Sequence, residues 1–338
     1  MTMRQIPVIG LTGHLGAGKT TLLNHLLARP GARTGVVIND FGAINVDAAL
    51  VSGQIDEAAS IAGGCLCCLT DAGGLDDALE RLTHPRLRLD AVIIEASGVA
   101  EPLALARLIR FSGASHARPG GMIDVVDALE HRRTVDIDAV PPVRYQAASL
   151  IIINKVDRIP VAERGAAVER LAARIRVSNP QVPILSAVRG GIDPSLVFDV
   201  AADADPVDEL PLAALARGDG VEHEHAAAVT VPAKGPVEAD AVIDLLESPP
   251  DGVYRIKGCV SIRTRQRLRR YLVNVVGHQV HIAPAPVPGP PDGLVAIGVR
   301  FDVAAVRSRL EMTLRASASA ASTAQGFRRL QRHRRLSE

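Results

Sequence analysis

One eight-residue stretch limits the folds open to this chain more than any other. It reads GHLGAGKT at residues 13–20 and fits the pattern G-x-x-x-x-G-K-[ST]. An apolar run, IPVIGL, precedes it, and a helical pattern, TTLLNHLL, follows it. Glycines allow the backbone to turn so that successive N–H groups face one anion, and the N-terminus of the following helix adds partial positive charge. The stretch therefore predicts a phosphate-binding loop between a strand and a helix.

The residues of this loop have different expected roles. Lys19 is expected to reach the β- and γ-phosphates and to act in catalysis, and the Thr20 hydroxyl is expected to bind Mg²⁺. The alternative, a glycine-rich turn without a ligand, is the weaker interpretation because strand, lysine, threonine and helix occur in this order. Nucleotide contacts are expected along the whole stretch, from Gly13, His14, Leu15, Gly16, Ala17, Gly18, Lys19, Thr20 and Thr21.

Short runs of Val, Ile and Leu alternate with helical patterns through the first 200 residues. Such nearly continuous apolar runs are typical of parallel strands that are covered on both faces. We therefore predict an α/β fold of the P-loop NTPase type, a parallel sheet with helices on both faces. The runs are residues 6–11, 35–38, 91–96, 122–128, 149–155 and 182–187.

The pattern changes after this P-loop domain, which we place at residues 1–200. Residues 201–228 are rich in Ala and Asp with little periodicity, and they predict a linker. Residues 229–314 contain further apolar runs and two helical patterns, and they predict a smaller C-terminal α+β domain with an antiparallel sheet. Residues 315–338 are small and polar and then basic, so we predict a disordered tail.

A second motif indicates which base is bound. SLIIINKVD ends a predicted strand with Asn154, Lys155 and Asp157, in the form N-K-x-D. A carboxylate there can accept hydrogen bonds from guanine N1–H and its exocyclic amine, whereas adenine offers neither. Together with the phosphate loop, this motif favours GTP over ATP. The stem of Lys155 can cover the base, and a backbone N–H at Ser186 or Ala187 is expected to bind guanine O6.

Acidic residues follow two other predicted strands. AVIIEASG ends one strand with Glu95 and reaches Gly98 three residues later. P-loop proteins place here an acid that organises Mg²⁺ and a glycine whose N–H meets the γ-phosphate. We expect Glu95 to bind Mg²⁺ through water or to orient the attacking water, the alternative being an ordinary turn acid. Asp40 and Asp47 follow GVVIN, in a segment expected near the phosphates.

Three of the four cysteines, Cys65, Cys67 and Cys68, stand in GGCLCCL, between Asp40 and Glu95. No second pair closes a structural tetrahedron, so they predict a metal site with an open position. Thiolates select Zn²⁺, Cu(I) and, less strictly, Co²⁺. Two alternatives remain, namely buried apolar thiols and a redox pair, although neighbouring cysteines form disulfides of poor geometry.

Composition argues against several other classes of protein. Basic and acidic residues nearly balance, 38 against 37, and aromatic residues make up 2% of the chain, so we do not expect nucleic-acid binding. No apolar run approaches the roughly 18 residues that span a bilayer, and no signal-peptide pattern is present. We therefore expect a cytoplasmic protein without a membrane partner. RNA binding by the C-terminal arginines is the alternative to a solvated tail.

Five stretches in order make the chain similar to the CobW-type metal-chaperone GTPases, which are related to the urease and hydrogenase metal-insertion GTPases. They are GHLGAGKTTLLNHLL, VVINDFG, GGCLCC, VIIEASGVAEP and INKVD. The similarity continues more weakly into VYRIKGCVSI and LVAIGVRFD. It implies GTP and Mg²⁺ at the phosphate loop, guanine at Asn154 and Asp157, and a transferable metal at Cys65, Cys67 and Cys68.

The resemblance also implies a function. It indicates a slow GTPase that binds zinc or cobalt and delivers the metal to a client metalloprotein under the control of the nucleotide. The alternative is a regulatory GTPase that acts through protein binding, with structural cysteines. The sequence leaves open which metal and which client are used, and whether the chain forms a homo-oligomer.

Overall fold

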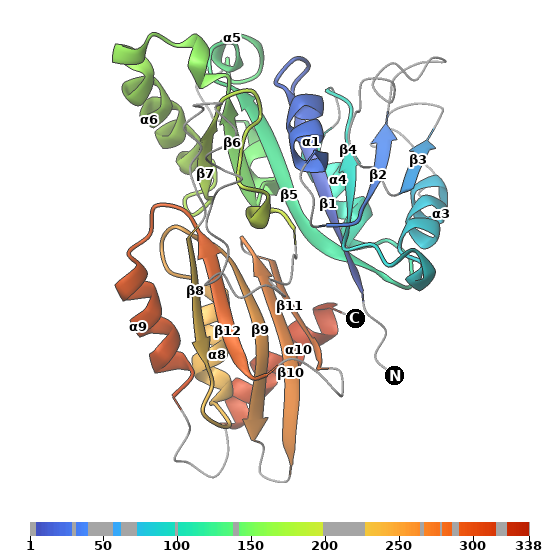
Figure 1. The fold of residues 1–338 in the computed structure, drawn as a ribbon, viewed down its shortest axis with the longest axis vertical. Coiled ribbons are helices and arrows are strands. Elements are labelled where there is room, and N and C mark those ends of the chain that lie inside the picture. The colour runs from blue at the N-terminus through green and yellow to red at the C-terminus, as the bar shows by residue number, and fades with distance from the viewer. Residues whose placement is uncertain are drawn as a thin grey trace, which may run out of the picture.

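The computed structural model shows two β-sheets with their helices, one above the other in Figure 1. None of the helices it describes is long and apolar enough to cross a membrane. The described residues are 5–28, 32–39, 57–61, 73–98, 101–137, 142–198, 227–263, 267–277, 279–285, 291–315 and 323–337.

The first sheet is entirely parallel in the described part of the chain, with the order β3-β2-β4-β1-β5-β6-β7. The predicted parallel sheet is therefore confirmed. Six of the strands coincide with the predicted apolar runs, whereas β3 was not predicted. The strands are β1 (Ile6–Gly13), β2 (Thr34–Asn39), β3 (Glu57–Ile61), β4 (Ala91–Glu95), β5 (Ala117–Asp127), β6 (Leu150–Asn154) and β7 (Ile184–Ala187).

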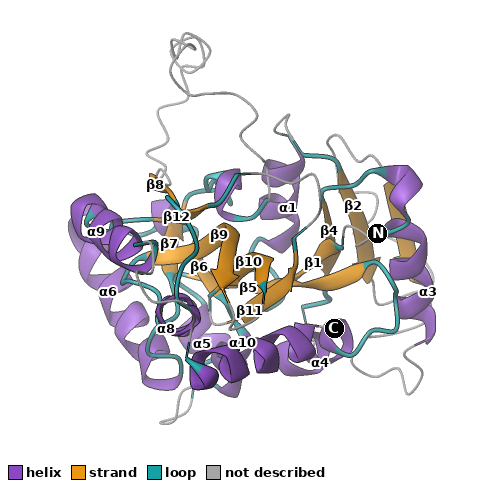
Figure 2. Ribbon diagram, turned by 90° about the horizontal axis from the view of Figure 1, so that it is seen from below, coloured by secondary structure: helices purple, strands orange, loops and turns teal. Residues whose placement is uncertain are grey.

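Helices and short 3₁₀ turns connect these strands. Figure 2 shows α1 on one side of the first sheet and α4 on the other. The helices are α1 (Lys19–Leu27), α3 (Gly73–Leu82), α4 (Pro102–Arg110), α5 (His131–Thr134) and α6 (Val161–Ser178). The 3₁₀ turns are η2 (Pro85–Leu87), η3 (Val143–Ala147), η4 (Val156–Arg158) and η5 (Pro194–Leu196).

Alternate strand residues pack against opposite helix layers. Ile9 and Leu11 of β1 share a buried cluster with the leucines of α1. Val8 of the same strand packs in a different cluster, with Leu79 of α3 and Leu105 of α4. Because β1, β4 and β6 are buried on both faces, they consist almost entirely of apolar residues, and this is why the sequence pattern predicted them.

The second sheet is antiparallel, with the order β11-β10-β9-β12-β8 in the described residues. Apolar side chains from three helices cover it in one cluster. The predicted C-terminal α+β unit is confirmed as a fold class. Its elements are β8 (Ala227–Pro232), α8 (Ala239–Glu247), β9 (Val253–Arg263), β10 (Leu268–Val276), β11 (Gln279–Pro284), β12 (Gly293–Gly298), α9 (Val303–Thr313) and α10 (Ala324–Ser337).

Besides their own cores, the two units meet in one buried hydrophobic cluster. Tyr254, Val276 and Ile297 of the second unit belong to the same buried cluster as Ile123 and Phe198 of the first. The two units are therefore packed together rather than merely tethered. The predicted domain boundaries, including the linker at 201–228, stay a prediction because residues 201–226 lie outside the described residues.

The expectation of a disordered tail at residues 315–338 is wrong for its last part, which forms α10. Leu330 is fully buried in the core of the second unit. Arg329 pairs with Asp244 of α8 at 2.7 Å and with Glu247 at 2.6 Å. The arginine-rich pattern suggested a solvated end, but acidic side chains about 80 residues earlier in the chain hold the helix in place.

Gly165 offers a test of the helical assignment of α6. It lies in the interior of the helix and is exposed, and a Cβ built there would meet nothing within 4 Å. Gly165→Ala is expected to raise the free energy of unfolding by about 0.5–1 kcal/mol, because alanine loses less backbone entropy on folding. Urea unfolding measures this change.

Gly258→Ala provides the contrast, since a Cβ at Gly258 would collide with the carbonyl oxygen of Gly293. This variant is expected to lower the free energy of unfolding. If Gly165→Ala also lowered the free energy of unfolding, the assignment of Gly165 to an exposed position inside α6 would be wrong.

Candidate functional site

The loop between β1 and α1 has the backbone shape that a phosphate loop requires. Gly16 and Gly18 have φ values of 77° and 102°, in the left-handed region that favours glycine. A Cβ at Gly18 would also collide with the side-chain amide of Asn154. The loop tip at Leu15 and Gly16 is exposed, and the helix begins at Lys19. Backbone N–H groups at a helix start are therefore accessible to an anion.

Lys19 lies inside this loop rather than in solvent. Its side chain is buried, with 8% of the residue exposed. Its Nζ donates a hydrogen bond to the carbonyl oxygen of Gly13 at 3.0 Å and a longer one to that of His14 at 3.4 Å. The ammonium group is thus held against the backbone of the phosphate loop, where a phosphate oxygen would meet it.

The structure brings together the two residues expected to hold magnesium. Glu95 is the last residue of β4 and is 3% exposed, and parallel pairing places it beside Leu11 of β1. Thr20 Oγ1 donates a hydrogen bond to Glu95 Oε1 at 2.7 Å. A hydroxyl and a carboxylate at one point supply the oxygen ligands that Mg²⁺ prefers, so these residues fit the ion. Their roles stay a prediction.

Gly98 lies directly against the tip of the phosphate loop. A Cβ at this position would stand 2.6 Å from the backbone N and 2.7 Å from the Cα of Leu15. Backbone atoms cannot move aside as the end of a flexible side chain can, so only glycine fits here. The start of the segment after β4 therefore lies against the phosphate loop, and contact of the Gly98 N–H with the γ-phosphate stays a prediction.

Asn154 connects the phosphate loop to the loop after β7. Its side chain is 1% exposed. Its Nδ2 donates to the carbonyl oxygen of Ala17 at 3.0 Å, and its Oδ1 accepts from the backbone N–H of Gly190 at 2.9 Å. The structure places this amide between two loops of the protein, and its contact with guanine, which the motif suggested, stays a prediction.

The remaining N-K-x-D residues lie at the adjoining strand end. Lys155 has a φ of 64°, and its Nζ is 2.6 Å from Asp127 Oδ2. Asp157 is exposed on η4, where a base could reach it. Pairing of β6 with β7 places Ser186 beside Ile153 and Ala187 beside Asn154. These residues therefore gather at one edge of the sheet, and their contacts with guanine stay a prediction.

Sequence reasoning missed Asp127, the last residue of β5. Besides Lys155, its carboxylate accepts hydrogen bonds from the backbone N–H groups of Leu129 and Glu130. Burial would raise the pKa of Asp127, but these hydrogen bonds outweigh it and hold the pKa below its usual value. The sequence signal that could have identified Asp127 was its position at the end of an apolar run. The pairing of its strand with the N-K-x-D strand is seen only in the structure.

A buried ion pair next to the phosphate loop was also missed. Arg144 of η3 binds Asp124 of β5 through two hydrogen bonds, at 2.8 and 3.1 Å. Thr12 Oγ1 donates to the same carboxylate at 3.1 Å. Partial burial, together with the charges of Arg144 and Lys19, lowers the pKa of His14. This environment therefore favours the neutral form of His14, which lies in a positive field at the start of the loop.

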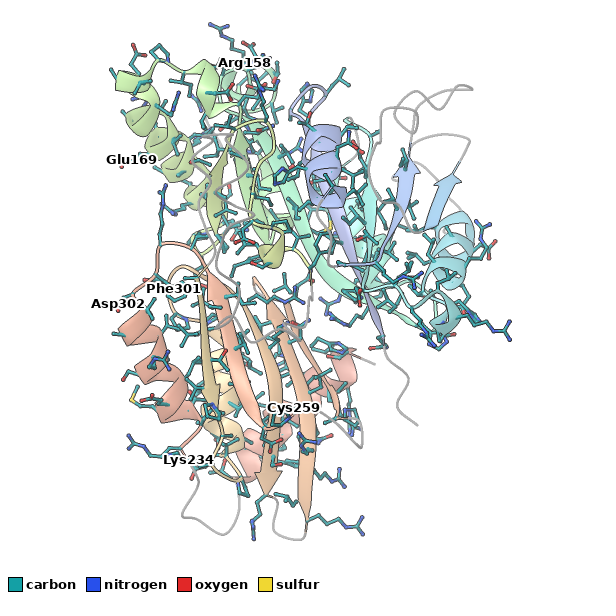
Figure 3. All side chains as sticks on the ribbon, viewed as in Figure 1. Arg158, Glu169, Lys234, Cys259, Phe301 and Asp302 are labelled. Carbon is teal, nitrogen blue, oxygen red and sulfur yellow. The ribbon has the colours of Figure 1, made fainter. Side chains whose placement is uncertain are left out.

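The transition metal was expected at three cysteine thiolates. Cys65, Cys67 and Cys68 lie outside the described residues, as do Asp40 and Asp47. Within the described stretches, no three His, Cys, Asp or Glu side chains come together in a way that could hold a metal ion. The fourth cysteine, Cys259, is 1% exposed in β9 of the second sheet, where Figure 3 labels it, and it was expected in the core.

Three features define a P-loop nucleotide-binding protein. They are a phosphate loop with glycines at positive φ, a lysine inside that loop, and a threonine hydrogen-bonded to a carboxylate at the end of the neighbouring strand. Residues 7–186 match the family described as "CobW/HypB/UreG, nucleotide-binding domain", and residues 226–314 match "Cobalamin synthesis protein cobW C-terminal domain". The first match alone covers more than half of the 338 residues. The chain belongs to the CobW/HypB/UreG family, and the family resemblance expected from the sequence is confirmed.

Curated relatives are similar over part or most of their length. The chain is 31% identical to "Zinc chaperone YjiA" of Escherichia coli (strain K12) over 58% of this chain and 62% of that protein. It is 27% identical to "Zinc chaperone CobW" of Sinorhizobium sp over 88% and 87%. The match therefore spans less than two thirds of the first relative. The solved structure of Zn(II)-bound YjiA GTPase from E. coli aligns over 92% of this chain and 99% of that chain, with 23% identity and a TM-score of 0.43.

Proposed function

We propose that the protein is a GTP-hydrolysing metallochaperone. It binds zinc or cobalt at Cys65, Cys67 and Cys68 and delivers the metal to a client metalloprotein, in a reducing compartment such as the cytoplasm. Membership of the CobW/HypB/UreG family and relatives named as zinc chaperones support the proposal.

One structural observation carries the link between nucleotide and metal. The strand order β3-β2-β4 places Ile61, the end of β3, at the same edge of the sheet as Glu95, the end of β4. The three cysteines follow Ile61 in sequence and precede Gly73, where α3 begins. The described residue nearest before them, Ile61, therefore lies at the edge of the sheet that carries the phosphate loop.

The nucleotide half of the proposal uses residues with assigned positions. Lys19 neutralises charge on the β- and γ-phosphates, and the backbone N–H groups of the loop orient them. Mg²⁺, when bound by Thr20 and Glu95, supplies further neutralisation of the phosphate charge. Glu95 also provides a buried carboxylate that can orient water at the end of β4.

The metal half follows from linkage. If GTP orders the segment that carries the thiols, it tightens metal binding, and metal must then tighten GTP binding by the same factor. A coupling of about 1–3 kcal/mol would change the affinity for metal roughly 5–150-fold. Thiolate ligands must lose protons, so metal affinity is expected to rise with pH.

A zinc titration tests the proposal. The full chain is titrated with Zn²⁺, and separately with Co²⁺, in the presence of Mg²⁺ and either a non-hydrolysable GTP analogue or GDP. We expect one ion per chain and an affinity roughly 5–150-fold higher with the GTP analogue. A variant with Ser at Cys65, Cys67 and Cys68 should lose this binding.

Cys259→Ala is the matched control, since it removes the one thiol that lies buried in the second sheet. It should bind metal as the unmodified chain does. Equal metal affinity with GTP analogue and GDP would reject control by the nucleotide. Binding that does not depend on the three cysteines would instead favour the alternative, a regulatory GTPase that acts through protein binding.

A further inference from the structure

A cavity of about 500 Å³ lies where the two units meet. The first unit contributes the end of α4, the loop after it and the start of β5, and the second contributes β10, β11 and α10. The end of α10 reaches the lower end of the first sheet in Figure 1, so this helix borders the cavity. A cavity of this size accommodates a small organic molecule.

The titratable side chains among the described residues that line the cavity are all of the basic types. They are Arg110, Arg118, His281 and His333, and no Asp or Glu belongs to the described lining. The nearby carboxylates have other partners. Asp76 and Glu80 of α3 accept backbone hydrogen bonds from Gly113 and Ser115, and Glu247 of α8 binds Arg329 and His333.

Two of the polar lining residues are deeply buried. Arg118 of β5 is 8% exposed, and Asn274 of β10 is 4% exposed. Asn274 stands opposite His281 in the antiparallel pair of β10 and β11. A guanidinium, a carboxamide and an imidazole thus line one hollow from both units, and all three can donate hydrogen bonds to an anion.

The surroundings of His281 disfavour the charged form of its ring. Burial and the charge of Arg118 lower the pKa of His281 to about 4. The imidazole is therefore neutral at neutral pH although it lies in a polar hollow. A negative charge between Arg118 and His281 would offset the arginine charge that disfavours protonation of the ring.

We propose that this cavity binds a small organic or inorganic dianion that carries carboxylate or phosphate groups. Arg118 and Arg110 bind it from the first unit, and Asn274 and His281 bind it from the second. Because the ligand contacts both units, its binding stabilises their packing against each other. The site is separate from the phosphate loop, since the lining includes no residue of the loop between Gly13 and Thr20.

Calorimetric titration tests this site. The full chain is first saturated with GDP and Mg²⁺, which occupy the phosphate loop so that added anions cannot bind there. Succinate and inorganic phosphate are the two probes, and the stronger one identifies the preferred group. We expect binding with one site per chain in the millimolar range or tighter, and a higher midpoint of thermal unfolding with the bound anion.

Two variants and a matched control locate the binding. Arg118→Gln and the surface variant Arg110→Gln should weaken binding, the former by roughly tenfold or more, as expected for loss of charged hydrogen bonds. Arg107→Gln removes an exposed arginine from the same last turn of α4, outside the cavity lining, and should leave binding unchanged.

The variants also decide against the proposal if they fail. Absence of binding by both probes in the millimolar range would overturn it. Equal binding by the unmodified chain, Arg118→Gln and Arg110→Gln would also overturn it. Since Arg118 is buried, Arg110→Gln keeps the test valid if Arg118→Gln does not fold.

Discussion

Replacing Lys19 with alanine is expected to slow GTP hydrolysis by about 10²–10³-fold, the usual effect of removing one fixed donor to the charge that develops in a transition state. The ammonium group is already buried in the loop, 3.0 Å from the carbonyl oxygen of Gly13. The backbone N–H groups remain in the variant, so binding of GDP should weaken less than hydrolysis slows. Single-turnover hydrolysis and GDP affinity, measured side by side, separate the two effects.

Lys234→Ala is the control for this experiment. Lys234 is an exposed lysine of the second unit, labelled in Figure 3, and it lies far along the chain from the phosphate loop. Its loss should change neither quantity. An unchanged hydrolysis rate in Lys19→Ala would show that the loop does not act on the γ-phosphate.

Asp157→Asn is expected to change the preferred nucleotide from GTP to XTP. Xanthine carries a carbonyl oxygen where guanine carries its amine, so an amide matches xanthine and a carboxylate matches guanine. Sites built to hydrogen-bond one group reject its analogue by up to about 10⁴–10⁵-fold. Since Asp157 is exposed on η4, we expect the ratio of the two affinities to change by a smaller factor, roughly 10²-fold.

Competition between GTP and XTP for a fluorescent nucleotide measures this ratio. Asp251→Asn makes the same chemical change at an exposed turn of the second unit and should keep the preference for GTP. If Asp157→Asn kept the ratio of the unmodified chain, Asp157 would not contact the base.

The sequence predicted the strands that are buried on both faces. It missed elements whose position depends on residues far away in the sequence. The apolar runs at residues 6–11 and 149–155 predicted β1 and β6. Both faces of these strands are covered, so nearly all of their residues are apolar. β3 reads EAASI and stands at the edge of the sheet, so its composition carries no comparable apolar run. α10 is held by Asp244 and Glu247, and no local pattern in its arginines shows where those acids lie.

The candidate site divides in the same way. The residues of the phosphate loop are consecutive, so one motif was enough to predict Lys19 and Thr20 as site residues, and the end of a strand was enough to predict Glu95. Asp127 and Arg144 act through partners on other elements, Lys155 and Asp124, and the pairing needs the strand order to be known. The bracing role of Asn154 also required the fold, because its partners Ala17 and Gly190 are 137 and 36 residues away.

The two hydrogen bonds of the Asn154 side chain determine when two loops of the protein lose their conformational entropy. By fixing Ala17 and Gly190 to one amide, they order the phosphate loop and the loop after β7 while the protein folds. The conformational entropy of these two loops is then already lost before a nucleotide arrives. In a preorganised pocket, less of the interaction energy with the nucleotide is offset by ordering the loops, so the affinity for the nucleotide is higher.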